Sequence, residues 1–277
     1  RLETAQYALD LLMTQSRTEA LRLATLLDQM NLERKAEQAR IVEEAKTQAL
    51  LYAADPVLVV SHPTWSHGII GIVAAKMLEF YDKPTFVLQE LEDGLAKGSA
   101  RSFGDFSAVA AIRATESYLV KGGGHKLAAG VTLKTEEIDG WRLAVNAYHR
   151  SLNLSDQTKY RDTRSDVTLM SFAECTEEQV RQISQLEPFG QGNPEPIFQI
   201  TPLTILSRRT MGSSNQHVKY RLEDTEGRTM DFIAFSKAEV FQLGPGEQVT
   251  IWCELAINEW QGRRSVEGRL LKMRRQD

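Results

Sequence analysis

The chain has 277 residues, a length typical of two domains, and its 42% hydrophobic content suffices for two packed cores. A formal net charge of −4 excludes a chain that is basic over its whole surface, so any contact with a polyanion must come from local clusters. No apolar stretch approaches the ~18 residues of a membrane-spanning helix, so no membrane partner is expected.

The first residues predict two helices. Apolar residues at helical spacing indicate a short helix over 2–13, and Ser16 with Glu19 forms a capping-box pattern that opens a long helix within 16–54. Beyond residue 31 this helix is polar on most of its surface, which is typical of a connection between two domains through solvent; a surface helix of one larger domain is the alternative. Because the chain opens at Arg1 without a methionine, inside a helical pattern, it is interpreted as a fragment.

Residues 55–154 alternate between strand and helix patterns, which predicts a small α/β domain. The region opens with a short, unbroken apolar run, as expected for a buried strand. The expected strands are 57–60, 85–88, 95–99 and a strand through 131–133, and the expected helices are 68–80, one from about 107 and one from 137.

The remainder divides into a linker and an all-β domain. Residues 155–196 begin polar, contain a short helix capped by Thr176, and end in a turn-rich segment, so they are expected to be a linker. Clean alternation of apolar and polar residues over 197–277 indicates about five strands and no long helix. We therefore predict a small barrel of the OB type, with a fragment of a two-sheet sandwich as the alternative.

A run of glycines is the most informative feature of the α/β region. Gly122, Gly123 and Gly124 lack the Cβ atoms that keep a ligand from the backbone, and His125 follows with a side-chain donor. The sequence predicts a loop in which successive N–H groups converge on an anion such as a phosphate. The alternative is a flexible hairpin turn that enters a strand.

Two further segments have anion-binding chemistry. Trp65 and His67 precede the helix that begins at residue 68, whose free N–H groups favour anions. Ser99 and Arg101 stand at the end of the third expected strand, where small neighbours leave room for a bidentate guanidinium–phosphate contact. The alternatives are that Trp65 only packs, that His67 caps the helix and that Arg101 forms a surface salt bridge. In an open α/β sheet, we expect these segments to meet at one edge.

The predicted barrel has a basic stripe. His217, Lys219 and Arg221 alternate along one strand and therefore share a face, and Trp260 lies in a hairpin where its indole could stack on a base. The alternative is an ordinary solvated face. The aromatic residue among the charges favours binding of a single-stranded nucleic acid.

Catalytic patterns are missing from this sequence. We find no paired carboxylates, phosphate-binding Walker loop or nucleophile elbow placed for catalysis, and Cys175 and Cys253 lack metal-ligand spacing. Such cysteines are expected to be reduced thiols of a cytoplasmic protein. The chain is therefore interpreted as holding a substrate rather than cutting it.

The motifs resemble the RecJ family of the DHH phosphoesterase superfamily, which are bacterial exonucleases specific for single-stranded DNA. Residues 65–74, 98–102 and 122–130 resemble its DHH-associated domain. Residues 188–196 resemble the lead into its OB domain, and residues 258–262 resemble a hairpin within that domain. Residues 1–2 resemble the close of the family's catalytic DHH domain, which implies that residues 1–15 are the tail end of that domain. The family's Asp-His-His metal-binding motif, which belongs to an N-terminal catalytic domain, does not occur in this sequence.

The resemblance implies a role for this chain within a larger enzyme. The intact protein would use Mn²⁺ or Mg²⁺ bound in the first domain to release nucleotides from the 5′ end of single-stranded DNA, in repair and recombination, and this chain alone would be inactive. Ser99 and Arg101 would bind the 5′ phosphate, with Arg1 as a further candidate, residues 122–125 would contact the DNA, and the OB domain would hold the strand further along.

Partners and rival functions follow from the same resemblance. Single-stranded DNA is the expected partner, together with a single-strand-binding protein and a repair helicase. One alternative is a DHH-family oligoribonucleotide or cyclic-dinucleotide phosphodiesterase, which usually lacks an added OB domain. The other is a non-catalytic module that docks nucleic acid or protein.

Overall fold

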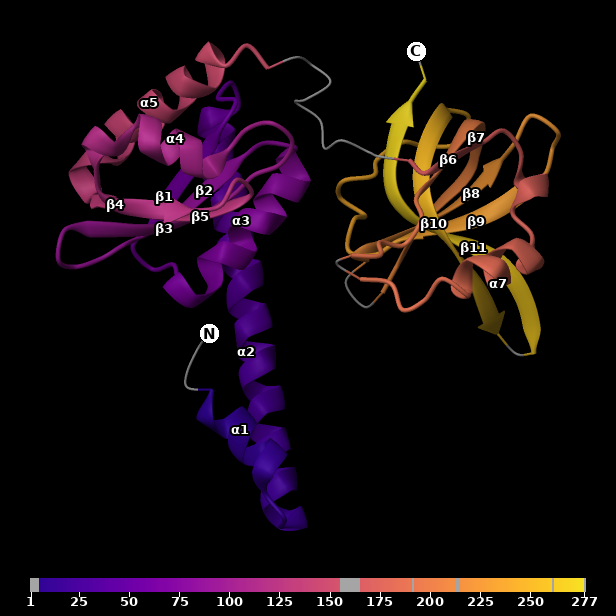
Figure 1. Cartoon of the computed structure of the whole chain (residues 1–277), viewed down its shortest axis with the longest axis horizontal. Helices are drawn as coiled ribbons and strands as arrows, with labels where there is room; N and C mark the ends of the chain where they lie inside the picture. The colour runs from indigo at the N-terminus through magenta and orange to yellow at the C-terminus, as the bar shows by residue number, and fades with distance from the viewer. Residues whose placement is uncertain (1–4, 155–164, 191, 213–214, 261, 277) are drawn as a thin grey trace. The chain divides into compact units, whose positions relative to one another are not determined.

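The computed structural model describes residues 5–154, 165–190, 192–212, 215–260 and 262–276. The chain forms two compact units that divide near residue 162 (Figure 1). The first unit contains an α/β domain with a long helix, and the second contains a β-barrel. Among the described residues, no helix combines the length and apolar character needed to cross a membrane.

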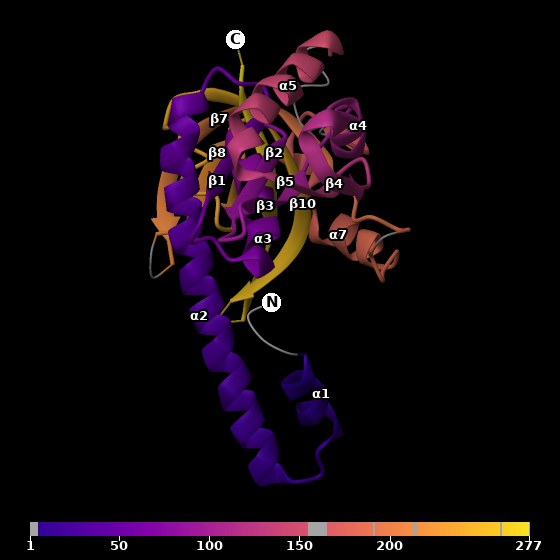
Figure 2. The ribbon, with the colours of Figure 1, turned by 90° about the vertical axis from the view of Figure 1, so that its left-hand side faces the viewer.

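Two helices open the first unit. Helix α1 spans Gln6–Met13, and α2 spans Arg17–Ala49 and begins where the Ser16 hydroxyl accepts the Glu19 N–H. Figure 2 shows α1 beside the N-terminal end of α2. The C-terminal turns of α2 bury Ile41 and Ala45 in the core of the α/β domain. The predicted connecting helix is therefore only partly separate from that domain, because its last turns form part of the core.

A five-stranded sheet forms the centre of the α/β domain. Strand order is β1-β2-β3-β5-β4, in which β1 and β2 are parallel and the other neighbours are antiparallel. This arrangement confirms the predicted α/β class. The strands are β1 Leu58–His62, β2 Thr85–Glu90, β3 Leu95–Arg101, β4 Leu119–Gly124 and β5 Ala128–Lys134, and the helices are α3 His67–Tyr81, α4 Ala108–Ala114 and α5 Ile138–Ser151.

Helices cover both faces of this sheet. Side chains of alternate strand residues point to opposite faces, so each face forms a separate core with its own pair of helices. On one face, α2 and α3 pack over β1 and β2, with Ile69 and Val60 in the core. On the other face, α4 and α5 pack with Phe86 and Trp141, whose rings meet edge to face with centroids 5.0 Å apart. The first of these faces carries the candidate site over β3, β5 and β4.

The glycine run is a strand rather than the predicted loop, and that prediction is wrong. Gly122, Gly123 and Gly124 belong to β4 and pair with β5, and only Gly124 has a positive φ, of 142°. Glycine is required at two of the three positions by close packing. A Cβ at Gly122 would lie 2.6 Å from Ile112 Cγ2, and one at Gly124 would lie 2.5 Å from Ala129 Cα. Because β4 pairs with β5, the N–H groups of this run do not converge on one point. The backbone is closer to the alternative given in the sequence analysis, a hairpin turn that enters a strand.

The second unit is a closed barrel, as predicted for an OB-type domain. Strands β7, β8, β9, β11 and β10 follow one another around it, and pairing between β10 and β7 closes the ring. Ile200, Tyr220, Phe232 and Ile251 are fully buried inside. The strands are β6 Val167–Leu169, β7 Phe198–Met211, β8 His217–Glu223, β9 Thr229–Ala234, β10 Gln248–Trp260 and β11 Arg263–Arg275.

Much of the predicted linker belongs to this second unit, so the expected boundary at residue 197 is corrected. Strand β6 pairs with β7, and helix α7, Glu177–Ser184, buries Val180 in the barrel core. The buried Asp224 carboxylate accepts hydrogen bonds from the Ser171 hydroxyl (2.8 Å) and the Phe172 N–H (2.9 Å). These contacts hold the segment before α7 against the barrel, because a buried carboxylate is stable only when its oxygens are satisfied.

Candidate nucleic-acid interface

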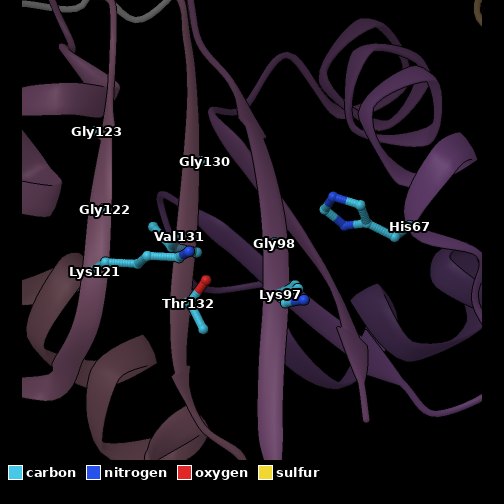
Figure 3. Close-up of a pocket in the computed structure, with 9 residues that line it drawn as sticks. All are labelled: His67, Lys97, Gly98, Lys121, Gly122, Gly123, Gly130, Val131 and Thr132. Carbon is cyan, nitrogen blue, oxygen red and sulfur yellow. The ribbon is translucent and has the colours of Figure 1, made fainter.

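Strands β3, β5 and β4 place three polar side chains in one row. Lys97 of β3 lies opposite Thr132 of β5, and Thr132 lies opposite Lys121 of β4. Directly opposite residues of antiparallel strands project from the same face. In Figure 3, the Lys121 side chain lies across toward Thr132, with Lys97 on the neighbouring strand. We call these three residues the lysine row.

A second row of small residues lies two positions further along the strands, on the same face. Ser99 of β3 is opposite Gly130 of β5, which is opposite Gly123 of β4. Arg101 comes two residues after Ser99, opposite Ala128. Because strand residues alternate between faces, Ser99 and Arg101 share the face of the lysine row.

Two adjoining hollows lie over these rows. The larger, of about 400 Å³, extends over the lysine row, and the smaller, of about 330 Å³, extends over Ser99 and Arg101. His67, Gly98 and Gly130 line both, and we call the combined feature the groove. Among its described lining residues are three cations and no carboxylate, in a chain whose net charge is −4. The groove is therefore locally suited to an anion.

Arg101 is held in place with its charge uncompensated. Its Nη1 donates to the Ser99 hydroxyl (3.3 Å) and to the Ala100 carbonyl (2.8 Å), and no ion pair forms with it in the described part of the chain. A Cβ at Gly71 of α3 would lie 3.1 Å from Ser99 Oγ and 3.3 Å from Arg101 Nη2. The glycine thus makes the room that these two side chains occupy.

His67 lies at the first residue of α3, beside the groove. Its backbone N–H donates to Gln89 Oε1 at 3.0 Å, which fixes the start of the helix against β2. The imidazole is exposed and turned toward β3 (Figure 3). The predicted placement of His67 beside Ser99 and Arg101 is thus what the structure has, on a sheet face rather than at a sheet edge.

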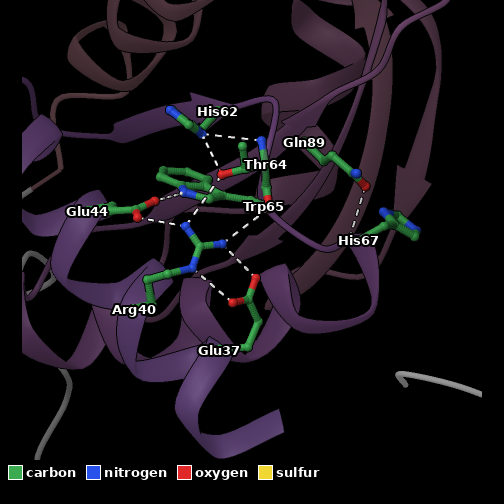
Figure 4. Close-up of polar contacts among 8 residues, drawn as sticks. All are labelled: Glu37, Arg40, Glu44, His62, Thr64, Trp65, His67 and Gln89. Carbon is green, nitrogen blue, oxygen red and sulfur yellow. Dashed lines mark hydrogen bonds and ion pairs between the residues drawn. The ribbon is translucent and has the colours of Figure 1, made fainter. Parts of the chain in front are cut away.

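A network of polar contacts holds the segment that leads to His67. Arg40 of α2 pairs with Glu37 and Glu44, both at 2.6 Å, and donates to the Thr64 carbonyl at 3.3 Å (Figure 4). The hydrogen bond from the Trp65 indole, followed by that from Arg40, lowers the pKa of Glu44 against the opposing effect of burial. The network ties α2 to the loop before α3.

Trp65 is a core residue, so the prediction that it binds nucleic acid is wrong. The side chain is 1% exposed, packs among residues of α2 and α3, and donates its Nε1–H to Glu44 Oε2 at 2.8 Å. A buried indole with a satisfied N–H has no face for a base. The packing alternative weighed for this residue is what the structure shows.

His125 lies in the turn between β4 and β5. Its N–H donates to the Ala128 carbonyl at 2.8 Å, and Ala128 in turn pairs with Arg101. His125 and Arg101 are thus at the same end of the sheet. The imidazole is exposed but lines neither hollow, so a contact with DNA from His125 stays a prediction.

The predicted basic stripe of the barrel is largely neutralised, which corrects the expectation of an open cationic face. Lys219 is bound between Glu267 at 2.7 Å and Asp231 at 3.0 Å, and Arg221 pairs with Asp231 at 3.5 Å. These acids come from β11 and β9, which the sequence alone does not place beside β8. The remaining member, His217, accepts the Ser236 N–H on its Nδ1 at 2.8 Å. Two other candidates, Arg1 and the side chain of Trp260, lie outside the described residues.

Replacing Lys219 with methionine is expected to lower the free energy of unfolding by about 1–3 kcal/mol, between the values for exposed and buried pairs. Binding of single-stranded oligonucleotides should not change. Burial lowers the pKa of Lys219, but the hydrogen bonds to Glu267 and Asp231 outweigh it and raise the pKa above the ordinary 10.5. The stabilisation is therefore present below pH 10.5 and lost as the pH rises through the raised pKa. Urea unfolding measured across this pH range should show that the difference in free energy of unfolding between parent and variant becomes smaller. A Lys219→Met variant of normal stability that binds oligonucleotides weakly would contradict this prediction.

Sequence reasoning missed Lys97, Lys121 and Thr132. One signal was available, because Lys97, Ser99 and Arg101 stand at every second position of one strand and so share a face. Lys121 directly precedes the glycine run, but its position beside Lys97 depends on the pairing of β4 with β5 and β5 with β3. That register is a tertiary property.

The described residues supply no metal centre, since no group of three or more His, Cys, Asp or Glu side chains lies close enough together to hold an ion. Both cysteines are buried in the barrel, and burial raises the pKa of the Cys175 thiol to about 12. Such a thiol is unreactive at neutral pH.

Comparison with known protein families identifies two domains in this chain. Residues 54–150 match the DHHA1 domain, and residues 166–272 match the RecJ OB domain. The chain is thus of the class of proteins in which a DHHA1 domain is followed by an OB domain.

Over nearly its whole length, the chain is similar to RecJ proteins. It is 31% identical to the single-stranded-DNA-specific exonuclease RecJ of Bacillus subtilis, over 96% of this chain and 34% of that protein. It is 30% identical to the RecJ of Thermus thermophilus, over 99% of this chain and 38% of that protein. A crystal structure of T. thermophilus RecJ in complex with Mg²⁺ superposes with a TM-score of 0.75 at 28% identity, over 99% of this chain and 41% of that one. The chain spans between a third and half of the length of these relatives.

Proposed function

We propose that this chain is the substrate-binding half of an exonuclease that degrades single-stranded DNA from the 5′ end, in DNA repair and recombination. The observation that carries the proposal is the groove, where Ser99 and Arg101 lie together with no carboxylate among the described lining residues. The names of the related proteins support single-stranded DNA as the substrate.

The 5′ phosphate is the part of the substrate assigned to Ser99 and Arg101. A terminal phosphate monoester carries a charge of about −1.5 to −2 at pH 7, whereas an internal diester carries one. A half-buried guanidinium without a carboxylate partner favours the more highly charged group, and its planar donors suit two phosphate oxygens. The Ser99 hydroxyl supplies a further donor. Residues 122–125 lie on β4 and in the turn to β5, the strand that pairs with β3, and are proposed to contact the DNA.

Divalent metal ions enter the proposal through the rest of the enzyme. Related RecJ structures are complexes with Mg²⁺ or Mn²⁺. Such ions activate water for attack on a phosphodiester. The described residues do not fit an ion, because they bring no suitable ligands together. We therefore assign to this chain only the binding and positioning of the strand.

The roles of the barrel and of the protein partners are proposed from the similarity to RecJ. The match of residues 166–272 to the RecJ OB domain supports a role for the second unit in holding the strand further along, and it disfavours a DHH phosphodiesterase of dinucleotides. A single-strand-binding protein and a repair helicase are proposed as protein partners. The β8 residues His217, Lys219 and Arg221 are not assigned to the DNA, because their polar groups are engaged within the barrel.

Binding to matched oligonucleotides tests the proposal. A labelled single strand with a 5′ phosphate is expected to bind this chain about 10-fold or more tightly than the same strand with a 5′ hydroxyl, since charge-assisted hydrogen bonds contribute about 1.5–3 kcal/mol. The same strand phosphorylated at its 3′ end is the control for added charge. Fluorescence anisotropy at fixed salt measures all three. Equal affinity for the 5′-phosphorylated and 3′-phosphorylated strands would overturn the assignment.

A further inference from the structure

We infer that the lysine row is a second phosphate subsite, which takes the phosphodiester next to the terminal phosphate. The groove would thereby select an oligonucleotide over a mononucleotide. The inference rests on the proposed function for the position of the first phosphate, at Ser99 and Arg101. Its own evidence comes from strand register, unpaired charge and a glycine that the protein's own packing does not require.

The register sets the separation of the two subsites. Lys97 precedes Ser99 by two residues on β3, and Thr132 follows Gly130 by two residues on β5. Two residues along a strand span about 7 Å. This separation is comparable with that between neighbouring phosphates of an extended single strand. A strand that lies along β3 and β5 therefore meets one cationic position after another.

The polar groups of the lysine row lack partners within the described part of the chain. No ion pair or hydrogen bond joins the ammonium group of Lys97 or Lys121 to another described residue, and the Thr132 hydroxyl has no hydrogen-bond partner there either. Thr132 is only 6% exposed, yet it lines the larger hollow. The Thr132 hydroxyl oxygen is not itself fully buried, so a ligand in the hollow can reach it. A phosphate oxygen in the hollow would supply the missing partner and would accept from both lysines.

Gly123 supplies an independent indication of a ligand. Its φ lies outside the left-handed region, so the backbone does not demand glycine, and a Cβ there would meet nothing within 4 Å. The neighbouring Gly122 and Gly124 are explained by close contacts inside the protein, whereas Gly123 is not. It belongs to the row of small residues, two positions after Lys121 on β4, and lines the larger hollow. An open position without a side chain suits close approach of a sugar–phosphate backbone.

Short ligands separate the two subsites. Thymidine 5′-monophosphate presents the terminal phosphate alone, 5′-phosphorylated dithymidylate presents that phosphate and one diester, and dithymidylate with a 5′ hydroxyl presents the diester alone. Competition against a labelled oligonucleotide measures the affinity of each. The parent chain is expected to prefer the phosphorylated dinucleotide over the mononucleotide by about 10-fold or more.

The double variant Lys97→Ala/Lys121→Ala is expected to lose this preference while it binds the mononucleotide as the parent does. For longer strands, the slope of log affinity against log salt should fall by about 0.7, as for one phosphate contact fewer. Lys76→Ala is the matched control, because Lys76 is exposed on α3 and lines neither hollow. Gly123→Ala keeps both charges and should also weaken dinucleotide binding. Circular dichroism checks that each variant is folded.

Different outcomes would overturn the two proposals. If the double variant binds both dinucleotides as the parent and Lys76→Ala chains do, the lysine row is ordinary solvated surface and this inference fails. If the parent ignores the 5′ phosphate but the double variant still loses affinity for dithymidylate with a 5′ hydroxyl, the proposed 5′-phosphate site fails and the lysine row stands.

Discussion

Replacing Arg101 with alanine is expected to abolish the preference of this chain for a 5′-phosphorylated strand. The loss should be about 10- to 100-fold in affinity, because charge-assisted hydrogen bonds to phosphate contribute about 1.5–3 kcal/mol. Affinity for strands with a 5′ hydroxyl should change little, since Arg101 lines the smaller hollow at the end of the groove away from the lysine row. Anisotropy titrations with the two strands measure the ratio.

Two further variants show whether charge or geometry matters at this position. Arg101→Lys keeps the charge but loses the planar pair of donors, so it should retain only part of the preference. Arg113→Ala removes an exposed arginine from the last turn of α4, away from the groove, and should bind as the parent does. A normal preference for the 5′ phosphate in Arg101→Ala would remove this residue from the site.

Replacing Trp65 with alanine is expected to lower the free energy of unfolding of the first unit by about 3–5 kcal/mol, as for other large aromatic side chains removed from a core. The cost should be high because the indole is 1% exposed between α2 and α3. Trp65→Phe retains most of the bulk and loses the hydrogen bond to Glu44, so its cost should be about 1–2 kcal/mol. Chemical unfolding followed by circular dichroism measures both.

The Trp65 variants also distinguish packing from base stacking. If the residue acts only through the fold, Trp65→Phe should bind oligonucleotides with the parent's affinity in conditions where it is folded. A Trp65→Ala chain of unchanged stability but weakened binding would contradict the core assignment and restore the stacking prediction.

The elements of both domains could be predicted because local patterns specify them. The Ser16 cap and the apolar residues of α3 predicted those helices within a few residues of their observed bounds. The boundary of the barrel was harder to predict. The segment around Ser171 reads as polar linker, and only the buried Asp224, more than fifty residues later, supplies the partners that hold it.

The candidate site was predicted in part. Ser99, Arg101 and His67 were chosen for residue chemistry, and the structure places them along one groove. Lys219 was chosen on the same grounds, yet its charge is compensated by Glu267 and Asp231 from two other strands. Residue chemistry identifies what a side chain can do, whereas its neighbours decide whether it is free to do it.

Amino-acid order alone was sufficient for the class of both domains and for the family motifs, because hydrophobic period, caps and glycine positions are properties of short segments. The groove came from tertiary structure. The register of β3, β5 and β4 places Lys97, Thr132 and Lys121 side by side. Pairing with β5 also makes the glycine run a strand rather than a loop. The physical reason is that pairing between strands depends on contacts across the whole sheet, which no short segment specifies.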